Sequence, residues 1–323
     1  MSDISTPGKG KTGRFENPFP GLRPFTPGES HLFFGREGQS QHVLSSLETS
    51  SFVAVTGASG SGKSSLIYCG VVPLLQGQAS RQWQVITSRP GTQPLHQLLD
   101  AFAEVFPGTF EAGELKKQVP GPGFARDILL QNKEIVEPLL IIIDQFEELF
   151  RFSGSGSEDH TEERAQFVDF IHEVISVDRL QVRVVITMRS DFIGECSVYQ
   201  NLTALINRSN YLIPQMTRED FRKAIEGPVH MAGATIEPVL VEQLLDEVGN
   251  NTDQLPVLQH ALMRTWDYWR LQNDPEKPIS TGDYEAIGRM EKALSDHANE
   301  AYDELDVRQR EICESMFKTL TDK

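Results

Sequence analysis

The chain has 323 residues, of which 46 are Asp or Glu and 30 are Lys or Arg, so its formal charge is −16. With 39% apolar residues and 8% aromatic residues, its composition is that of an ordinary globular protein and excludes collagen-like, coiled-coil and low-complexity chains. The strongly apolar runs, such as 139–143, are far shorter than the ~18 to 20 residues of a transmembrane helix, so we expect no membrane partner. The length predicts about two domains.

The N-terminus has basic residues without an apolar stretch behind them, which argues against a secretory signal. Three widely spaced cysteines do not suggest a disulfide framework, so we expect a cytoplasmic protein. Residues 217–323 hold 12 basic and 22 acidic residues, a net −10, and the rest holds 18 and 24, a net −6. Because nucleic-acid binders usually show a basic surface, this balance disfavours a DNA or RNA partner.

The first 50 residues precede the regular pattern of the chain. Residues 1–15 are Ser, Thr, Gly, Pro and Lys with almost nothing apolar, which predicts a disordered tail. The Pro- and Phe-rich stretch that follows predicts an extended segment held by apolar contacts. Helical spacing of Val43, Leu44 and Leu47 then predicts a short helix before residue 50.

From residue 51 onward, short apolar runs alternate with segments of helical period. Buried strands separated by helix-length spacers predict an α/β domain with a parallel sheet that is covered on both faces. We expect exposed connections at 153–163 and at the GPG of 121–123. The predicted strands are 51–57, 83–90, 137–146, 182–190 and 210–216.

After Met216 the apolar residues follow helical spacing only. The sequence therefore predicts a sheet domain over 51–216 and a helical domain over 217–292. The last amphipathic segment, for which Asp306 is the expected N-cap, belongs to a third region over 293–323.

The motif GASGSGKS fits the phosphate-loop pattern G-x-x-x-x-G-K-[ST] at each required position, and it follows a strand and precedes a helix. The glycines let backbone N–H groups converge on phosphate oxygens. Lys63 is expected to reach the β and γ phosphates, and the Ser64 hydroxyl to bind Mg²⁺. The alternative is a surface turn that happens to contain a lysine. The expected nucleotide-binding residues of the loop are Gly57, Ala58, Ser59, Gly60, Ser61, Gly62, Lys63, Ser64 and Ser65.

In LLIIIDQFEELF, Asp144 lies at the carboxyl end of an aliphatic strand, where open α/β sheets bind ligands. We expect Asp144 to hold Mg²⁺ beside Ser64, and Glu147 or Glu148 to polarise the attacking water, with Glu147 preferred. The alternative is that both glutamates only begin a solvated helix.

Three further candidates flank this site. Arg189 ends the strand VVITMRS, from where its guanidinium can reach the γ phosphate, unless it only caps the strand. The segment Phe34-Gly35-Arg36 precedes the first strand and can cover the base, with Arg36 on a phosphate or a carbonyl, or it can simply start a helix. Pro256 fits the first turn of a helix, and its spacing alone assigns it no function.

In their order, the segments NPFPGLRPFTPGESHLFFGRE, VTGASGSGKSSL, LLIIIDQFEELF, VVITMRSDF and DQLPVLQHAL resemble the STAND class of signal-transduction ATPases, specifically novel STAND NTPase 1, over about residues 16–320. The resemblance implies an adenine lid over 16–50, a sensor role for Arg189 and contact of Pro256 with the base. DQFEEL also resembles the D-G-h-D-E pattern of NACHT ATPases, which implies that Glu147 activates water. One departure is GRMEKAL at 288–294, where relatives often read GG…GAL.

The resemblance implies a P-loop NTPase switch that binds ATP or ADP with Mg²⁺ and self-associates in the ATP state. It also implies a winged helix beginning in 293–323 and continuing, with a C-terminal sensor such as WD repeats or a protein partner, beyond this chain. We expect slow ATP hydrolysis in a signal-transduction or defence protein. The alternatives are a scaffold that oligomerises without hydrolysis and an AAA+-like ATPase that acts on DNA.

Overall fold

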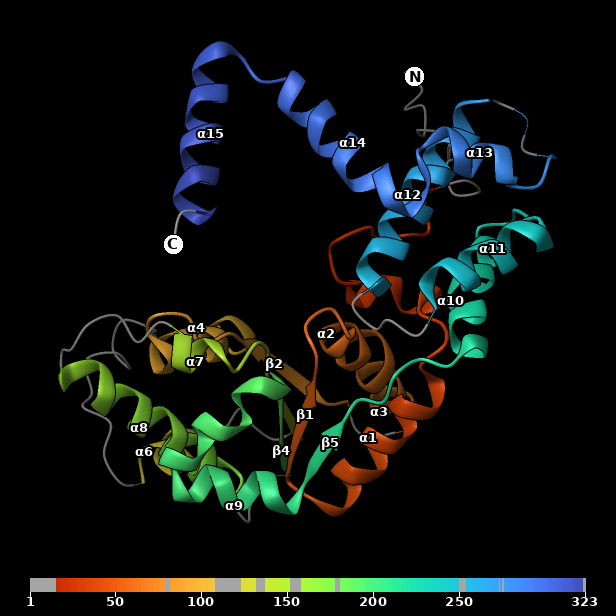
Figure 1. Cartoon of the computed structure of the whole chain (residues 1–323). Coiled ribbons are helices and arrows are strands. Elements are labelled where there is room, and N and C mark those ends of the chain that lie inside the picture. Colours follow the sequence, from red (N-terminus) through yellow and green to blue (C-terminus); the bar gives the residue numbers. More distant parts are fainter. Residues whose placement is uncertain are drawn as a thin grey trace, which may run out of the picture. The chain divides into compact units, whose positions relative to one another are not determined.

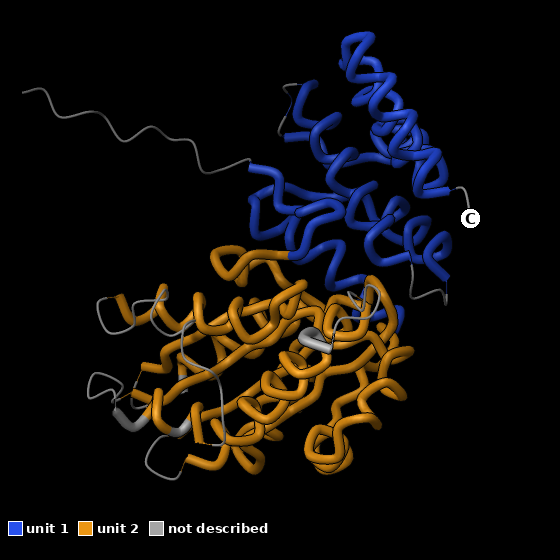
Figure 2. Tube along the Cα trace, turned by 90° about the vertical axis from the view of Figure 1, so that its left-hand side faces the viewer, with its two compact units in different colours: residues 1–24, 217–323 blue, residues 25–216 orange. Residues whose placement is uncertain are grey.

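The computed structural model describes residues 16–321 apart from 79–81, 108–122, 132–136, 152–157, 178–180, 250–253, 273 and 275. Two units are distinguished in Figure 2, one formed by residues 25–216 and the other by residues 1–24 with 217–323. Of the segment expected over 16–50, residues 16–24 thus lie with the helical unit and the rest with the sheet unit. The predicted disordered tail, 1–15, lies outside the described residues.

Five parallel strands form the sheet in the order β2-β3-β4-β1-β5 (Figure 1). This confirms the predicted five-stranded parallel sheet, and it places β4 between the strand of the phosphate loop and the strand that precedes Asp144. The carboxyl ends of β1, β3 and β4 therefore meet at one edge. The strands are β1 Phe52–Gly57, β2 Gln84–Ser88, β3 Leu139–Ile143, β4 Val182–Arg189 and β5 Asn210–Leu212.

Alternate residues of each central strand pack on opposite faces of the sheet, as strand geometry requires. In β3, Leu139, Ile141 and Ile143 face one apolar cluster, and Leu140 and Ile142 face another. Because both faces are covered, the β3 sequence is apolar throughout rather than alternating.

Helices from both sides of the sheet complete these two clusters (Figure 1). One face is covered by α1 Glu37–Thr49 and by the helical segment after the phosphate loop, and the other by helices of the later connections. That helical segment contains α2 Lys63–Ser65, the π-helix η2 Leu66–Val71 and α3 Val72–Gln78. The opposite face is covered by α4 Pro94–Val105, α6 Phe124–Gln131, α8 Glu158–Val174 and α9 Gln200–Arg208.

Several predicted boundaries were wrong. The strands predicted over 83–90, 137–146 and 210–216 are shorter, because the turn at Asp144 and the segment after Leu212 leave the sheet. The strand β5 is a sheet edge with exposed or half-buried residues, not a buried strand. The expected connection 153–163 was also wrong from Glu158 onward, where α8 begins. Of the GPG turn, Gly123 is a turn residue with φ +87°, and 121–122 lie outside the described residues.

The regular secondary structure of the second unit, within the described residues, is helix, apart from one isolated bridge between Ile236 and Ile279. The predicted N-cap Asp306 lies just before the last helix and accepts the Gln309 N–H. The winged helix stays a prediction, since the described part of 293–323 contains helix only. The helices are α10 Arg218–Met231, α11 Pro238–Val248, α12 Leu255–Leu271, α13 Thr281–Ala286, α14 Arg289–Asp303 and α15 Val307–Thr321.

Before the sheet, η1 Pro27–Leu32 follows the Pro- and Phe-rich stretch, and Phe25 packs edge-on against Phe33. Between β4 and α9 lies η3 Ser190–Val198, and between β3 and α8 lies α7 Glu148–Arg151. Within the described residues, no helix combines the length and apolarity that a membrane span requires.

Candidate functional site

The phosphate loop connects β1 to α2 and has an exposed tip at residues 58–60. Gly60 and Gly62 have φ of +72° and +84°, a conformation that residues with a Cβ adopt only at a cost. A Cβ at Gly57 would lie 2.9 Å from the Ser61 hydroxyl oxygen, so this glycine allows the loop to fold back on β1. The structure thus explains why the motif has glycine at each of these three positions.

The buried amine of Lys63 is held by the loop itself. Its Nζ donates to the carbonyl oxygens of Ala58 at 2.7 Å and Gly57 at 3.2 Å. Burial lowers the pKa of Lys63, and the nearby Glu147 carboxylate opposes that shift. The loop carbonyls thus hold the amine of Lys63 within the phosphate loop, beside the Glu147 carboxylate.

Asp144 joins the loop to the sheet. Its Oδ1 accepts hydrogen bonds from the Ser64 and Thr187 hydroxyls, each at 2.6 Å, and its side chain is fully buried. Thr187 also accepts the Gln145 N–H at 3.0 Å, so it orients both residues of the turn after β3. The structure thus brings together the two residues expected to hold the metal.

The two glutamates that follow have different partners. Glu147 is 6% exposed, accepts the Arg189 N–H at 3.2 Å and interacts electrostatically with Lys63. Glu148 accepts the N–H of Gly91 at 3.0 Å, in the connection after β2. Within this pair, Glu147 is thus the residue tied to both the lysine and the end of β4.

The side chain of Arg189, at the end of β4, forms two hydrogen bonds with Asp191, at 3.0 and 2.7 Å. Its guanidinium also lies over the Phe192 ring. Hydrogen bonding to Asp191 raises the pKa of Arg189, which keeps the group charged. The predicted sensor arginine therefore lies beside Glu147 but is engaged with another carboxylate.

Arg36 connects the segment before β1 to the phosphate loop. Its guanidinium is buried and donates to the carbonyl oxygens of Ser61 and Pro214, both at 2.9 Å. Gly35 has φ +83° and its N–H is bound by Glu37 at the start of α1. Of the two partners considered for Arg36, the structure shows the carbonyl.

The remaining candidates are Ser65, Phe34 and Pro256. The Ser65 hydroxyl accepts the Phe25 N–H at 3.2 Å and so anchors the N-terminal segment. Phe34 is half-buried just before Gly35. Pro256 lies in the first turn of α12, as its sequence context predicts, and it belongs to the other unit.

The loop and its neighbours fit a nucleoside polyphosphate with Mg²⁺. The Ser61 hydroxyl is buried and has no hydrogen-bond partner among the described residues, although it lies in the phosphate loop. Ser64 and Asp144 offer the hard oxygen ligands that Mg²⁺ prefers, and phosphate oxygens and water would complete its shell. When bound, the metal would supply positive charge to the phosphates.

Sequence reasoning missed Arg89, Thr187 and Tyr68. Arg89 follows β2, and its guanidinium nitrogen lies 3.3 Å from Asp144 Oδ2. Burial, with the Asp144 charge as a second cause, raises the pKa of Tyr68. Arg89 and Thr187 could have been found only by knowing that β2 and β4 flank β3, and Tyr68, on η2, is likewise marked by no motif.

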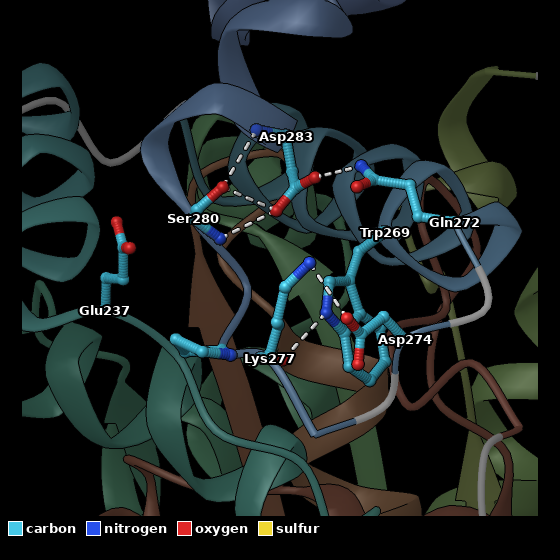
Figure 3. Close-up of a pocket in the computed structure, with 8 residues that line it drawn as sticks. Glu237, Trp269, Gln272, Asp274, Lys277, Ser280 and Asp283 are labelled. Atoms are coloured by element: carbon cyan, nitrogen blue, oxygen red, sulfur yellow. Dashed lines mark hydrogen bonds and ion pairs between the residues drawn. The ribbon is translucent and has the colours of Figure 1, made fainter.

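A separate pocket of about 130 Å³ lies in the helical unit between α12 and α13 (Figure 3). Its polar groups bind one another: the Trp269 indole N–H donates to the Lys277 carbonyl, and Lys277 pairs with Asp274. Asp283 accepts hydrogen bonds from Gln272 and Ser280 (Figure 3). These bonds fix the connection between the two helices, so we assign the pocket a structural role.

The sequence model of one family, described as Novel STAND NTPase 1, matches residues 18–323. No curated protein matches the chain. The fold is similar to that of an ORC2 protein of Aeropyrum pernix, solved as ADPNP-ADP complexes, with TM-score 0.58, 15% identity, and coverage of 81% of this chain and 68% of that chain.

Two further solved structures share the fold. ORC1 of Aeropyrum pernix in complex with DNA has TM-score 0.56 and 13% identity, over 85% of this chain and 69% of that chain. A Walker-type ATPase of Pyrococcus abyssi, paby2304, has TM-score 0.51 and 15% identity, over 86% of this chain and 75% of that chain. At these identities the likeness concerns the fold alone.

Proposed function

The chain belongs to the novel STAND NTPase 1 family, and we propose that it is an ATP/ADP-dependent molecular switch that hydrolyses ATP slowly with Mg²⁺. The observation that carries this proposal is the buried hydrogen-bond chain from Ser64 through Asp144 to Thr187, which ties the phosphate loop to two strands. A ligand that changes one member of such a network affects the others.

Each residue at this edge has a role in the proposal. Backbone N–H groups of 57–65 and Lys63 bind the phosphates, while Ser64 and Asp144 hold Mg²⁺. Glu147 orients and deprotonates the attacking water, because a base must lie within hydrogen-bond reach of that water. The segment Phe34-Gly35-Arg36 and Pro256 would serve the adenine side.

Arg189 would report whether the γ phosphate is present. In the described arrangement its guanidinium is neutralised by Asp191, and a γ phosphate would offer it a second anionic partner. A nucleotide shifts a conformational equilibrium only through contacts that differ between the two states. Exchange of Arg189 between Asp191 and the γ phosphate would be such a difference.

Slow hydrolysis is proposed because each arginine at this edge would have to leave its present partner before it could stabilise the transferring phosphoryl group. Arg36 binds carbonyls, and Arg89 and Arg189 bind carboxylates. An arginine finger stabilises the charge of the transferring phosphoryl group, and an ATPase without one is slow. We further propose a cytoplasmic signal-transduction or defence role, self-association in the ATP state, and regulation by a C-terminal sensor module or protein partner.

The first test is to denature the purified chain and identify the nucleotide it releases. ADP or ATP is expected; GDP would overturn the assignment of the base. Turnover of ATP by the wild type should stay below about 10 per second. Glu147→Gln should bind ATP but lose most of the turnover, and Glu148→Gln should lose less. A larger loss of turnover in Glu148→Gln than in Glu147→Gln would assign activation of the water to Glu148. If the wild type hydrolyses no ATP over hours, the result would favour a scaffold that oligomerises without hydrolysis.

A second candidate function is a DNA-associated ATPase, favoured by the similarity in fold to DNA-bound ORC1. The net −10 over residues 217–323 argues against it, because phosphate contacts need clustered Lys and Arg. Titration of duplex DNA at 150 mM salt decides between the two. Micromolar affinity that weakens steeply with salt would favour the DNA-associated ATPase.

A further inference from the structure

Arg89 lies directly beside the metal-binding aspartate. The strands β2 and β3 pair in parallel up to Ser88 and Ile143, and the Asp144 N–H then donates to the Ser88 carbonyl at 2.9 Å. The residue that follows β2, Arg89, is thereby placed level with Asp144. Its guanidinium donates to Oδ2 at 3.3 Å.

The two oxygens of Asp144 have different partners. Oδ1 accepts the neutral hydroxyls of Ser64 and Thr187, whereas Oδ2 accepts the charged guanidinium. The carboxylate is fully buried, but the Arg89 side chain is 53% exposed. A buried carboxylate is costly unless a positive charge or a set of donors compensates it. Arg89 supplies that charge from the open side of the site.

Glu148 holds the segment that carries Arg89. Its carboxylate accepts the N–H of Gly91, two residues after Arg89, and Gly91 has φ +56°, which closes a tight turn. Glu148 is the first residue of α7, four residues after Asp144. The turn after β3 therefore fixes both the carboxylate and the position of its arginine partner.

We propose that Arg89 is the resident counter-ion of Asp144 and exchanges with Mg²⁺ at Oδ2, with Glu148 as the residue that positions Arg89. This inference rests on the proposed function, because it assumes that Asp144 binds the metal. Both cations need the same oxygen, so each weakens the binding of the other. Bound phosphate gives the displaced guanidinium a new anionic partner, since arginine binds carboxylate and phosphate with the same fork of N–H groups.

The exchange makes metal binding depend on nucleotide binding. Without nucleotide, Mg²⁺ must displace Arg89 from Asp144 with no alternative partner for the arginine. With nucleotide, Arg89 can turn to a phosphate, and the aspartate becomes available. Removal of the guanidinium should therefore strengthen binding of the metal to the nucleotide-free chain. It should also reduce the increase in metal affinity that the nucleotide causes.

The test measures binding of Mn²⁺, as a probe for Mg²⁺, to the full chain stripped of nucleotide, from the electron paramagnetic resonance signal of free Mn²⁺. Arg89→Gln should bind Mn²⁺ about five- to tenfold more tightly than the wild type, the scale of one half-exposed charged hydrogen bond. Arg89→Lys keeps the charge without the fork and should lie between them. The matched control, Arg208→Gln, removes an exposed charge at the opposite end of the sheet and should change the affinity less than twofold.

Equal affinity of wild type and Arg89→Gln, or weaker binding by the variant, would overturn the exchange. Failure of the proposed metal site is a different result: wild type would then bind Mn²⁺ no better than Asp144→Asn. A second titration with a non-hydrolysable ATP analogue should show that the analogue tightens Mn²⁺ binding more in the wild type than in Arg89→Gln. Equal tightening in both would also overturn the exchange.

Discussion

The two units use charged side chains in opposite ways. At the carboxyl edge of the sheet, Arg36, Asp144 and Glu147 are 0–6% exposed, and each is hydrogen-bonded to another segment of the sheet unit. In the helical unit, pairs such as Arg218 with Glu242 are about half exposed on both sides. A buried charge is tolerated only with its partners in place, whereas an exposed pair contributes little. The comparison predicts that single substitutions of charged residues disturb the first region strongly and the second weakly.

Replacement of Arg36 by Ala should give the largest effect. It removes the donors to the Ser61 and Pro214 carbonyls and leaves a void in a buried position. The free energy of unfolding should fall by about 3 kcal/mol, measured by urea denaturation, because unpaired buried polar groups and the cavity both cost energy. Arg36→Lys should be less damaging, as it can still bind one carbonyl. A loss below 1 kcal/mol for Arg36→Ala would show that burial of charge is not what distinguishes this region.

Gly70→Ala should destabilise the sheet unit by about 2 kcal/mol, because overpacking forces neighbours to move. A Cβ at Gly70, in the π-helix after the phosphate loop, would lie 2.1 Å from the Ser40 hydroxyl oxygen and 3.4 Å from Phe33. Gly77→Ala is the matched control: its Cβ meets nothing within 4 Å, so a small stabilisation from helix propensity is expected. Similar urea midpoints for the two variants would contradict a close contact at Gly70.

Gln145→Gly should stabilise the protein by about 0.5 kcal/mol. Gln145 has φ +57°, which costs a residue with a Cβ more than it costs glycine, and the flexibility of glycine in the unfolded chain offsets part of the gain. Gln145→Ala keeps the strain and serves as the control. Arg289→Gly makes the same change at φ +59° in the helical unit, outside any ligand site. Thermal unfolding measures the stability of each variant, and a nucleotide titration measures its affinity. A loss of nucleotide affinity in Gln145→Gly but not in Arg289→Gly would show that the strained backbone at Gln145 serves binding.

The parallel sheet, the phosphate loop and the position of Asp144 at a strand end were predictable, because glycine spacing and apolar runs are local signals. The pairing of Asp144 with Thr187 and Arg89 was not, since it depends on strand order: β4 and β2 flank β3 although their sequences are distant. The π-helix at Leu66–Val71 was also missed. Its apolar spacing resembles that of an α-helix, so the sequence carries no local signal that distinguishes the two.

His260 makes the stability of the helical unit depend on pH. Burial lowers the pKa of this histidine, which stacks on His297 of α14 and has Arg264 nearby. The unfolded chain therefore binds a proton at higher pH than the folded chain does. Stability should be full above the ordinary histidine pKa of about 6.5 and decrease as pH falls below it. His260→Gln should remove most of this dependence between pH 7.5 and 5.5 in thermal unfolding, and an unchanged pH dependence would assign it to other groups.

Glu242→Gln should give the smallest effect. Hydrogen bonds from Arg222 and Arg218 lower the pKa of Glu242, but Glu242 and Arg218 are exposed and Arg222 is only half-buried, so water and salt screen their interaction. The urea midpoint should differ from wild type only slightly at low salt and not at all in 1 M NaCl. Glu147→Gln, the same chemical change at a buried carboxylate, should differ clearly at both salt concentrations because it weakens the link between β4 and Lys63. If instead the two substitutions had equal effects on the urea midpoint, exposure would not decide which charged residues stabilise the fold.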